Sequence, residues 1–198
     1  RYGTGCDVDE AFDEWDTGRE DVLDIECVII IDNSGSMYGQ MSNAYQSMWA
    51  IKRALDKIGA STTVVTFSYN EYLLYSADEK ATGAYRDIGC GGGTQPTQAI
   101  RYARSVLANS DRSIMLFIAI TDGEWYDSDE ADDIIKHFRK AGVITALGMI
   151  GAGSLEHGDV TINTHGCEAA ASINEMDQLF VLAKDMVRVG IKKNLLRA

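Results

Sequence analysis

Two almost unbroken apolar runs, Ile25–Ile31 and Ile114–Ile120, constrain the fold of this chain more than any other feature. Each run is far shorter than the roughly 18 to 20 apolar residues that a membrane-spanning helix needs. Strand side chains point alternately to the two faces of a sheet, so a strand that is apolar at nearly every position must be covered on both faces. The two runs therefore predict central strands of a sheet that lies between layers of helices.

The rest of the chain alternates between strand-like and helix-like patterns. Apolar residues at helical spacing predict helices between Met41 and Ile58, after Pro96, between Asp127 and Gly142, and between Met176 and Val187. Runs rich in β-branched, aromatic or apolar residues predict strands at Thr62–Phe67, Tyr72–Tyr75, Val143–Ile150 and Cys167–Ile173. This order favours an α/β fold: a Rossmann-like, open, mostly parallel twisted sheet with helices on both faces.

Local signals refine this expectation at two places. The turn-like Tyr69-Asn70-Glu71 joins Thr62–Phe67 to Tyr72–Tyr75, which predicts a hairpin whose second strand lies at an edge of the sheet. Asp127 with Glu130 three residues later resembles a capping box at the start of a helix.

The length of 198 residues favours one domain, with room for a short extension. Residues 1–24 carry nine carboxylates against two arginines and are predicted to be an acidic N-terminal arm. Residues 25–198 are predicted to form the folded domain.

Charge and cysteine usage limit the kinds of partner and compartment. The net charge of -12 repels phosphate backbones and anionic lipid headgroups, so we expect no nucleic acid as a partner. The short apolar runs predict no membrane span. The four cysteines are scattered without a CxxC pair, and a core of this size needs no disulfides. Free thiols in a reducing compartment fit this pattern better, although disulfides stay open as an alternative.

Polar residues gather where the predicted central strands end. Asp32 and Asp122 follow the two apolar runs, and a glycine-rich loop ending at Thr94 precedes a helix at the same edge of such a sheet. Asp32-x-Ser34-x-Ser36 offers a carboxylate and two hydroxyls on alternate residues of one tight turn. Oxygen ligands of this kind suit a hard cation such as Mg²⁺.

Each of these residues also has an ordinary structural explanation. Asp32, Ser34 and Ser36 could cap a turn or a helix, and the glycines could simply form a flexible loop. Known catalytic motifs do not fit the chain: there is no Gly-x-Ser-x-Gly elbow and no Gly-Lys-Ser/Thr phosphate loop. His165 and Cys167 lack the spacing and the four ligands of a structural zinc site.

Taken together, the motifs resemble the metal-ion-dependent adhesion site of the von Willebrand factor type A family. In this chain they read Asp32-Asn33-Ser34-Gly35-Ser36, Gly92-Gly93-Thr94 and Thr121-Asp122-Gly123. The resemblance implies that a divalent metal, Mg²⁺ with Mn²⁺ as an alternative, is bound by Asp32, Ser34, Ser36, Thr94 and Asp122, with Thr97 as a fallback for Thr94. It further implies a non-enzymatic, protein-binding module in which an Asp or Glu of the partner takes the open metal position.

Within that family, the motif Asp-Asn-Ser-Gly-Ser-Met and the short connections are similar to intracellular members, such as the cobaltochelatase subunit CobT and proteins that accompany MoxR-type AAA+ ATPases. This similarity implies a cytoplasmic protein with an AAA+ or chelatase-like partner. An extracellular or surface adhesion module and a metal-dependent hydrolase stay open, although no His accompanies the metal motifs as a general base. Trp125 and Tyr126 are predicted to contact the partner beside the metal.

Overall fold

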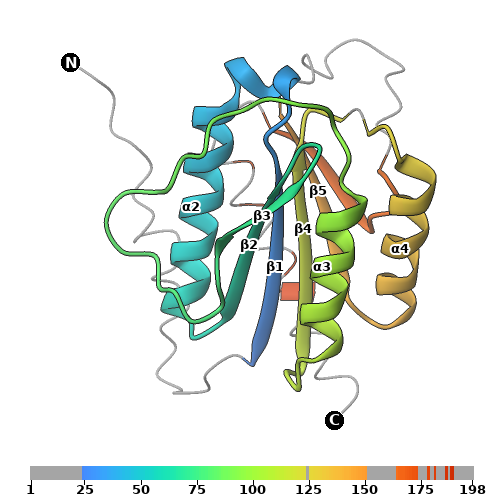
Figure 1. Cartoon of the computed structure of the whole chain (residues 1–198). Coiled ribbons are helices and arrows are strands. Elements are labelled where there is room, and N and C mark those ends of the chain that lie inside the picture. Colours follow the sequence, from blue (N-terminus) through green and yellow to red (C-terminus); the bar gives the residue numbers. More distant parts are fainter. Residues whose placement is uncertain are drawn as a thin grey trace.

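A six-stranded sheet forms the centre of the domain, in the order β3-β2-β1-β4-β5-β6 (Figure 1). The computed structural model describes residues 24–123, 125–150 and 164–173, together with Gln178, Val181, Met186, Arg188 and Val189. The elements in chain order are β1 (Ile25–Asp32), the 3-10 helix η1 (Gly35–Gly39), α2 (Met41–Lys57), β2 (Ser61–Phe67), β3 (Glu71–Tyr75), α3 (Thr97–Ala108), β4 (Ile114–Thr121), α4 (Ser128–Lys140), β5 (Ile144–Ile150) and β6 (Ala169–Ile173).

The pairing of the strands confirms the predicted fold class. β1 pairs in parallel with β2 and with β4, and β4-β5 and β5-β6 are also parallel. β3 pairs antiparallel with β2 and lies at the edge of the sheet, as the hairpin signal predicts. Strand β6 begins two residues later than expected, because the N–H of Cys167 donates to the carbonyl oxygen of Thr164 in a turn that precedes it.

Alternate residues of β1 serve two separate cores. Cys27, Ile29 and Ile31 pack into the core that includes α2, whereas Val28 and Ile30 pack into the core that includes α3 and α4. Every residue of β1 is buried, as expected for a strand covered on both faces. Each fully buried isoleucine contributes about 1.5–3 kcal/mol through the hydrophobic effect, so this strand anchors both layers.

The capping box predicted at the start of α4 is absent. Asp127 occupies the N-cap position but makes no hydrogen bond to the first turn of α4. Its Oδ2 instead accepts the backbone N–H of Thr97 at 3.3 Å, and Glu130 forms an ion pair with Arg101. Both side chains therefore tie α4 to its neighbour α3, because the two helices lie side by side on one face of the sheet (Figure 1).

The described cysteines are free thiols. Cys27 is buried on β1, Cys90 is partly buried and Cys167 is buried, while Cys6 lies outside the described residues. Burial raises the pKa of Cys27 strongly and that of Cys167 to about 12, so both remain protonated near neutral pH. These two cysteines therefore act as small hydrophobic side chains rather than as nucleophiles.

Two predictions concern segments that are mostly outside the described residues. Only Asp24 of the predicted acidic arm is described. Of the last predicted helix, Gln178, Val181 and Met186 are described; they are helical, and Met186 packs into the core on the α2 side. No helix among the described residues has the length and apolar character that crossing a membrane requires.

Candidate metal centre

Three loops meet at the carboxyl end of the parallel strands. The N–H of Gly35, in the loop after β1, donates to the carbonyl oxygen of Gly92 at 3.1 Å. The N–H of Tyr126, in the loop after β4, donates to the carbonyl oxygen of Thr94 at 2.9 Å. These hydrogen bonds bring the glycine-rich loop between the other two, as the sequence predicts.

Asp32 is the buried carboxylate at the centre of this edge. Its Oδ1 accepts the N–H of Ser34 at 2.8 Å, and its Oδ2 accepts the hydroxyl of Thr121 at 2.7 Å. Burial raises the pKa of Asp32 to about 6; the hydrogen bonds from Ser34 and Thr121 oppose this rise, and the nearby Asp122 charge adds to it. A positive charge in this place would favour the ionised form.

The hydroxyls of Ser34 and Ser36 lie against each other, with 3.0 Å between their Oγ atoms. Ser34 is the N-cap residue of η1, yet its side chain makes no capping hydrogen bond. The capping explanation for Ser34 therefore does not hold, and both hydroxyls are adjacent to the turn that presents Asp32.

The two threonines of the glycine-rich loop differ in position. Thr94 is buried in the loop that contacts Tyr126, while Thr97 is the first residue of α3, where its N–H donates to Asp127. Both threonines are thus hydrogen-bonded to the segment between β4 and α4, and the hydroxyl of Thr97 is buried without a hydrogen-bond partner among the described residues. Thr94 remains the first choice because it directly follows the glycines of the loop, and Thr97 stays the fallback.

Asp122 directly follows β4, and its Oδ1 is buried without a hydrogen-bond partner among the described residues. A buried polar atom of this kind is costly unless something binds it. No described Lys or Arg forms an ion pair with Asp122 or Asp32. Unbalanced carboxylates beside hydroxyls make a donor set that fits a divalent hard cation.

The described residues offer no alternative metal site built from His, Cys, Asp or Glu side chains. In the described ranges, no three His, Cys, Asp or Glu side chains are close enough together to hold a metal. His165 pairs with Asp132 instead, and His157 lies outside the described residues.

Thr121 is a residue of the site that the sequence reasoning missed. Its hydroxyl donates to Asp32 and accepts the N–H of Gly123 at 3.1 Å and the indole N–H of Trp125 at 3.2 Å. One hydroxyl thus holds the carboxylate of Asp32 and the loop that carries Asp122. Its position directly before Asp122 was the only available signal, because the bond to Asp32 spans 89 residues of sequence.

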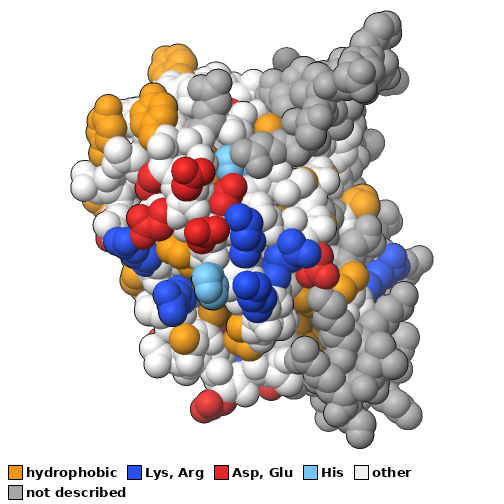
Figure 2. All heavy atoms as spheres, turned by 90° about the vertical axis from the view of Figure 1, so that its right-hand side faces the viewer, with side chains coloured by type: hydrophobic (Ala, Val, Ile, Leu, Met, Phe, Trp, Pro, Cys, Tyr) orange, Lys and Arg blue, Asp and Glu red, His pale blue; other side chains and the backbone are white. Residues whose placement is uncertain are grey.

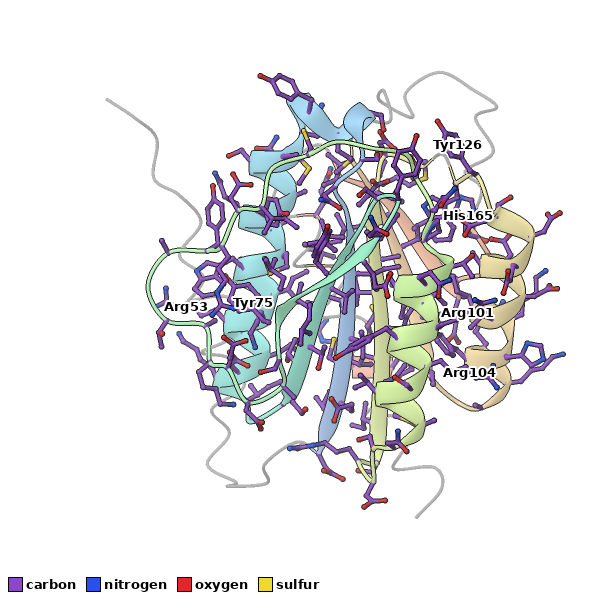
Figure 3. The ribbon with its side chains drawn as sticks, in the orientation of Figure 1. Arg53, Tyr75, Arg101, Arg104, Tyr126 and His165 are labelled. Atoms are coloured by element: carbon purple, nitrogen blue, oxygen red, sulfur yellow. The ribbon has the colours of Figure 1, made fainter. Side chains whose placement is uncertain are left out.

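The predicted contact pair is divided by the structure. Trp125 is 7% exposed and packs against Phe67 and His165, so its ring offers almost no surface to a partner. Tyr126 is 71% exposed at the same end of the sheet (Figure 3). The prediction that Trp125 contacts the partner is therefore wrong, because its ring is buried. The prediction for Tyr126 stays open.

Tyr126 and the exposed Tyr69 flank the glycine-rich loop. A Cβ atom on Gly93 would lie 2.5 Å from Cε1 of Tyr69 and 3.0 Å from Cε2 of Tyr126. A side chain on Gly93 would therefore displace one or both exposed rings. The aromatic surface at the candidate centre thus comes from these two tyrosines.

Charges are unevenly distributed beside the centre. Asp129, Glu130 and Asp133 are exposed on the first half of α4, and Lys136 and Lys140 on its second half (Figure 2). This order matches the helix dipole, which favours acidic residues at the start of a helix and basic residues at its end. The acidic half begins next to the third loop, so the local surface charge does not attract a carboxylate.

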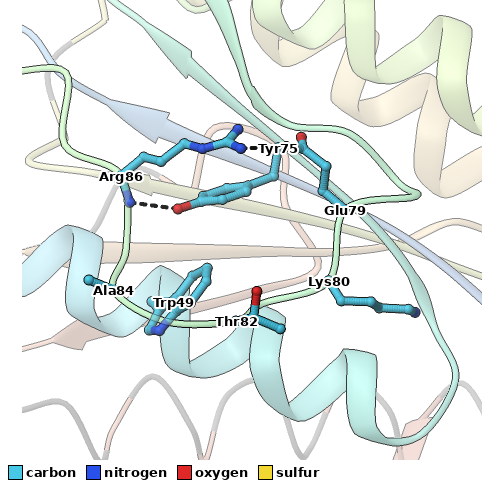
Figure 4. A pocket seen from close by; sticks show the side chains of 7 residues that line it. All are labelled: Trp49, Tyr75, Glu79, Lys80, Thr82, Ala84 and Arg86. Carbon is cyan, nitrogen blue, oxygen red and sulfur yellow. Dashed lines mark hydrogen bonds and ion pairs between the residues drawn. The ribbon is translucent and has the colours of Figure 1, made fainter.

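A separate pocket of about 270 Å³ lies between α2 and the segment after β3 (Figure 4). It is lined by Trp49, Tyr75, Glu79, Lys80, Thr82, Ala84 and Arg86. Arg86 spans one side: its N–H donates to the Tyr75 hydroxyl at 2.6 Å and its guanidinium pairs with Glu79. None of the metal-binding or partner-contact residues predicted from the sequence lines this pocket.

Solved structures with the same fold support this description. The von Willebrand factor domain of the type V pili tip protein Mfa5 from Porphyromonas gingivalis has a TM-score of 0.64 at 12% identity, covering 84% of this chain and 96% of that one. The manganese-loaded TRAP protein of Plasmodium vivax has a TM-score of 0.58 at 17% identity, covering 84% and 74%.

Proximal thread matrix protein 1 from the mussel byssus, solved with a zinc-occupied metal-ion-dependent adhesion site, has a TM-score of 0.59 at 19% identity and covers 83% of this chain. The match spans only 45% of the mussel protein's length. At these identities the likeness establishes the fold alone.

No curated protein sequence matches the chain. The sequence model of the von Willebrand factor type A domain matches residues 26–176, which are more than half of this chain. This match agrees with the strand order and with the three loops that meet at the carboxyl edge. The chain therefore belongs to the von Willebrand factor type A domain family.

Proposed function

We propose that this domain binds a partner protein by holding one of its carboxylates through a divalent metal, Mg²⁺ in the first place. The metal would be bound by Asp32, Ser34, Ser36, Thr94 and Asp122. The observation that carries the proposal is the unbalanced negative charge of Asp32 and Asp122, beside two hydroxyls 3.0 Å apart. A divalent ion would supply the missing positive charge and an open position for a further oxygen.

The chain's own residues would prepare the site for the ion. Thr121 and the N–H of Ser34 fix both oxygens of Asp32, which limits its rotation. The loop bonds from Gly35 and Tyr126 set the distance between the serine turn, Thr94 and the third loop. The site is therefore held in place by backbone contacts, and binding requires little ordering of the protein.

The choice of Mg²⁺ rests on the size and number of the ligands. Two carboxylates and three hydroxyls on three adjoining loops suit an ion that binds six oxygens and retains water. Ca²⁺ is larger and takes more oxygens, so we expect it to substitute less well than Mn²⁺. The mussel protein with a zinc-occupied adhesion site supports a divalent ion at this place in the fold, and the manganese-loaded TRAP protein is a second similar fold that holds a divalent ion.

We infer that the domain binds its partner without catalysing a reaction. We further propose that the protein is cytoplasmic and that its partner is a MoxR-type AAA+ ATPase or a chelatase-like assembly. The motif Asp-Asn-Ser-Gly-Ser-Met and the free thiols of Cys27, Cys90 and Cys167 support this placement and partner. Surface adhesion is the second candidate, which the pili tip protein among the similar folds favours.

The carboxylate-binding role can be tested without a known partner. We expect the Mn²⁺-loaded protein to enhance the NMR relaxation of the methyl protons of acetate, because acetate would bind the open metal position. Acetamide has the same methyl group without the charge and serves as the control ligand. EDTA should abolish the enhancement, and moderate NaCl should leave it nearly unchanged, since a direct metal-oxygen bond is little screened.

Equal enhancement with acetate and acetamide would contradict the proposal. So would enhancement that disappears with salt while the metal remains bound, because this result would indicate diffuse electrostatic attraction.

A further inference from the structure

His165 has an unusual backbone conformation for a buried residue. Its φ is 48°, the only positive φ of a non-glycine residue in the described part of the chain, and it is 1% exposed. Left-handed backbone is unfavourable for most residues with a side chain, so such a conformation persists only where surrounding contacts enforce it. The contacts of its imidazole ring show what holds it there.

Both ring nitrogens of His165 face acceptors. Nδ1 lies 3.0 Å from Oδ1 of Asp132, on α4, and Nε2 lies 3.2 Å from the carbonyl oxygen of Gly123. Both partners have oxygen atoms that accept hydrogen bonds, so the ring lies within hydrogen-bond distance of α4 through one nitrogen and of the loop after β4 through the other. The ring thus connects α4 to the loop that carries Asp122 (Figure 3).

Trp125 extends this connection to Asp32. Its ring stacks on His165, with centroids 3.9 Å apart and an interplanar angle of 21°. Its indole N–H donates to the hydroxyl of Thr121, which in turn donates to Asp32. A continuous path of contacts therefore joins Asp132 to the carboxylate at the candidate centre.

The two residues that flank Asp122 are both held by this path. Thr121 is fixed through Asp32 and Trp125, and Gly123 through its carbonyl oxygen on His165. Mg²⁺ tolerates little departure from octahedral geometry, and residues that orient metal ligands affect affinity nearly as much as the ligands do. Small shifts of this loop should therefore weaken metal binding.

We propose that His165 is a positioning residue for the metal centre: through its contacts with the Gly123 carbonyl and the Trp125 ring, it would keep the loop that carries Asp122 in place for metal binding. This inference rests on the proposed function of the site. It assigns His165, Trp125 and Asp132 a role that is separate from both metal ligation and partner contact.

Two substitutions separate positioning from mere stability. Asparagine tolerates left-handed backbone and can donate to Asp132, but it is too short to reach Gly123. Glutamine can reach the Gly123 carbonyl, but it tolerates the backbone less well. We expect His165→Asn to keep most of the fold's stability and to bind Mg²⁺ about tenfold more weakly. We expect His165→Gln to be less stable while it keeps Mg²⁺ affinity close to that of the wild type.

A matched pair on α4 tests the other end of the path. Asp132→Asn should weaken Mg²⁺ binding, because it removes the charge that holds His165. Asp133→Asn makes the same chemical change at the next residue, whose side chain is 71% exposed and contacts Lys136, and it should leave the affinity unchanged.

Isothermal titration calorimetry with Mg²⁺ alone decides between the outcomes, with thermal unfolding measured in parallel. If the wild type binds no Mg²⁺, the proposed function fails. If the wild type binds and His165→Asn binds equally well, the positioning role is overturned while the metal site stands. Affinity that follows thermal stability across both His165 variants would also overturn it.

Discussion

Lys52 and Asp32 are both completely buried, yet the charge of Lys52 is balanced within the protein and that of Asp32 is not. The Nζ of Lys52 lies 3.3 Å from Oδ1 of Asp56 and donates to the carbonyl oxygen of Thr62 at 3.0 Å. Asp56 also accepts the N–H of Ala81 at 2.7 Å. Every charged group in this cluster has a partner from its own chain.

Asp32 lies at the other extreme. The charged residue that acts on it is Asp122, which carries the same sign and raises the pKa of Asp32 further. In a buried ion pair each charge is neutralised by its partner, so the pair has a structural role. Two neighbouring carboxylates leave negative charge that a bound cation can neutralise. Charge balance, rather than burial alone, distinguishes Asp56, which is paired within the protein, from Asp32, which we propose binds a ligand.

The largest effect is expected from breaking the balanced pair. Lys52→Met keeps most of the side-chain volume but leaves the Asp56 carboxylate without its cation, so we expect a loss of about 3–5 kcal/mol in the free energy of unfolding. Chemical denaturation measures this loss. Adding Asp56→Asn should recover part of it, and Mg²⁺ affinity should not change in either variant. A loss below about 1 kcal/mol, as for exposed pairs, would show that the cluster is not a buried ion pair in solution.

The pH dependence of the metal-free protein should reveal the unbalanced site. Because the pKa of Asp32 is raised from 3.8 to about 6, its contribution to stability is fully present below about pH 4 and is lost as the pH rises through 6. The full contribution is at most about 3 kcal/mol. It appears as the difference between the wild type and Asp32→Asn when unfolding is measured in EDTA. If the stability of the two proteins changed with pH in the same way, Asp32 would not carry an unbalanced charge in the folded protein.

Removing Asp122 should separate ligand binding from folding. For Asp122→Ala we expect Mg²⁺ affinity to fall by at least ~100-fold. Residues that only orient metal ligands cost up to about this much when they are mutated, and Asp122 is a proposed ligand. Stability in EDTA should stay equal or rise slightly, since the repulsion with Asp32 disappears. Calorimetry and thermal unfolding measure the two effects. A variant with unchanged Mg²⁺ affinity would place the metal elsewhere.

The smallest effect is expected at the rim of the open site. Tyr126→Ala removes an exposed ring that neither ligates metal nor packs in a core, so partner binding should weaken by about tenfold, the size of a moderate contact at an interface. Metal affinity and stability should match the wild type. Tyr72→Ala, at a comparably exposed tyrosine on the edge strand β3, is the control. Equal partner affinity for both variants and the wild type would exclude the aromatic rim from recognition.

Much of the fold could be predicted because its signals are local. The apolar runs of β1 and β4 require cover on both faces, and the spacing from Met41 onward fixes the buried face of α2. Aspartates at the ends of parallel strands lie at the same edge of the sheet, so the common edge of Asp32 and Asp122 could be predicted. Their proximity also needs β1 and β4 to be neighbours, which the structure shows. Their role as metal ligands remains a prediction that the experiments above can test.

The layers, the order of elements and the edge at which the polar loops gather could be predicted from the sequence, because these depend on periodicity and chain order. The burial of Trp125 and the exposure of Tyr126 could not, because these adjacent aromatic residues differ only in what distant segments pack against them. Two contacts were equally hidden from the sequence. The side chain of Asp127 accepts a hydrogen bond from the first residue of α3 rather than capping α4, and His165 contacts Gly123, which is 42 residues away in the chain. Such contacts depend on how distant segments pack against one another, and no local pattern of side chains encodes that packing.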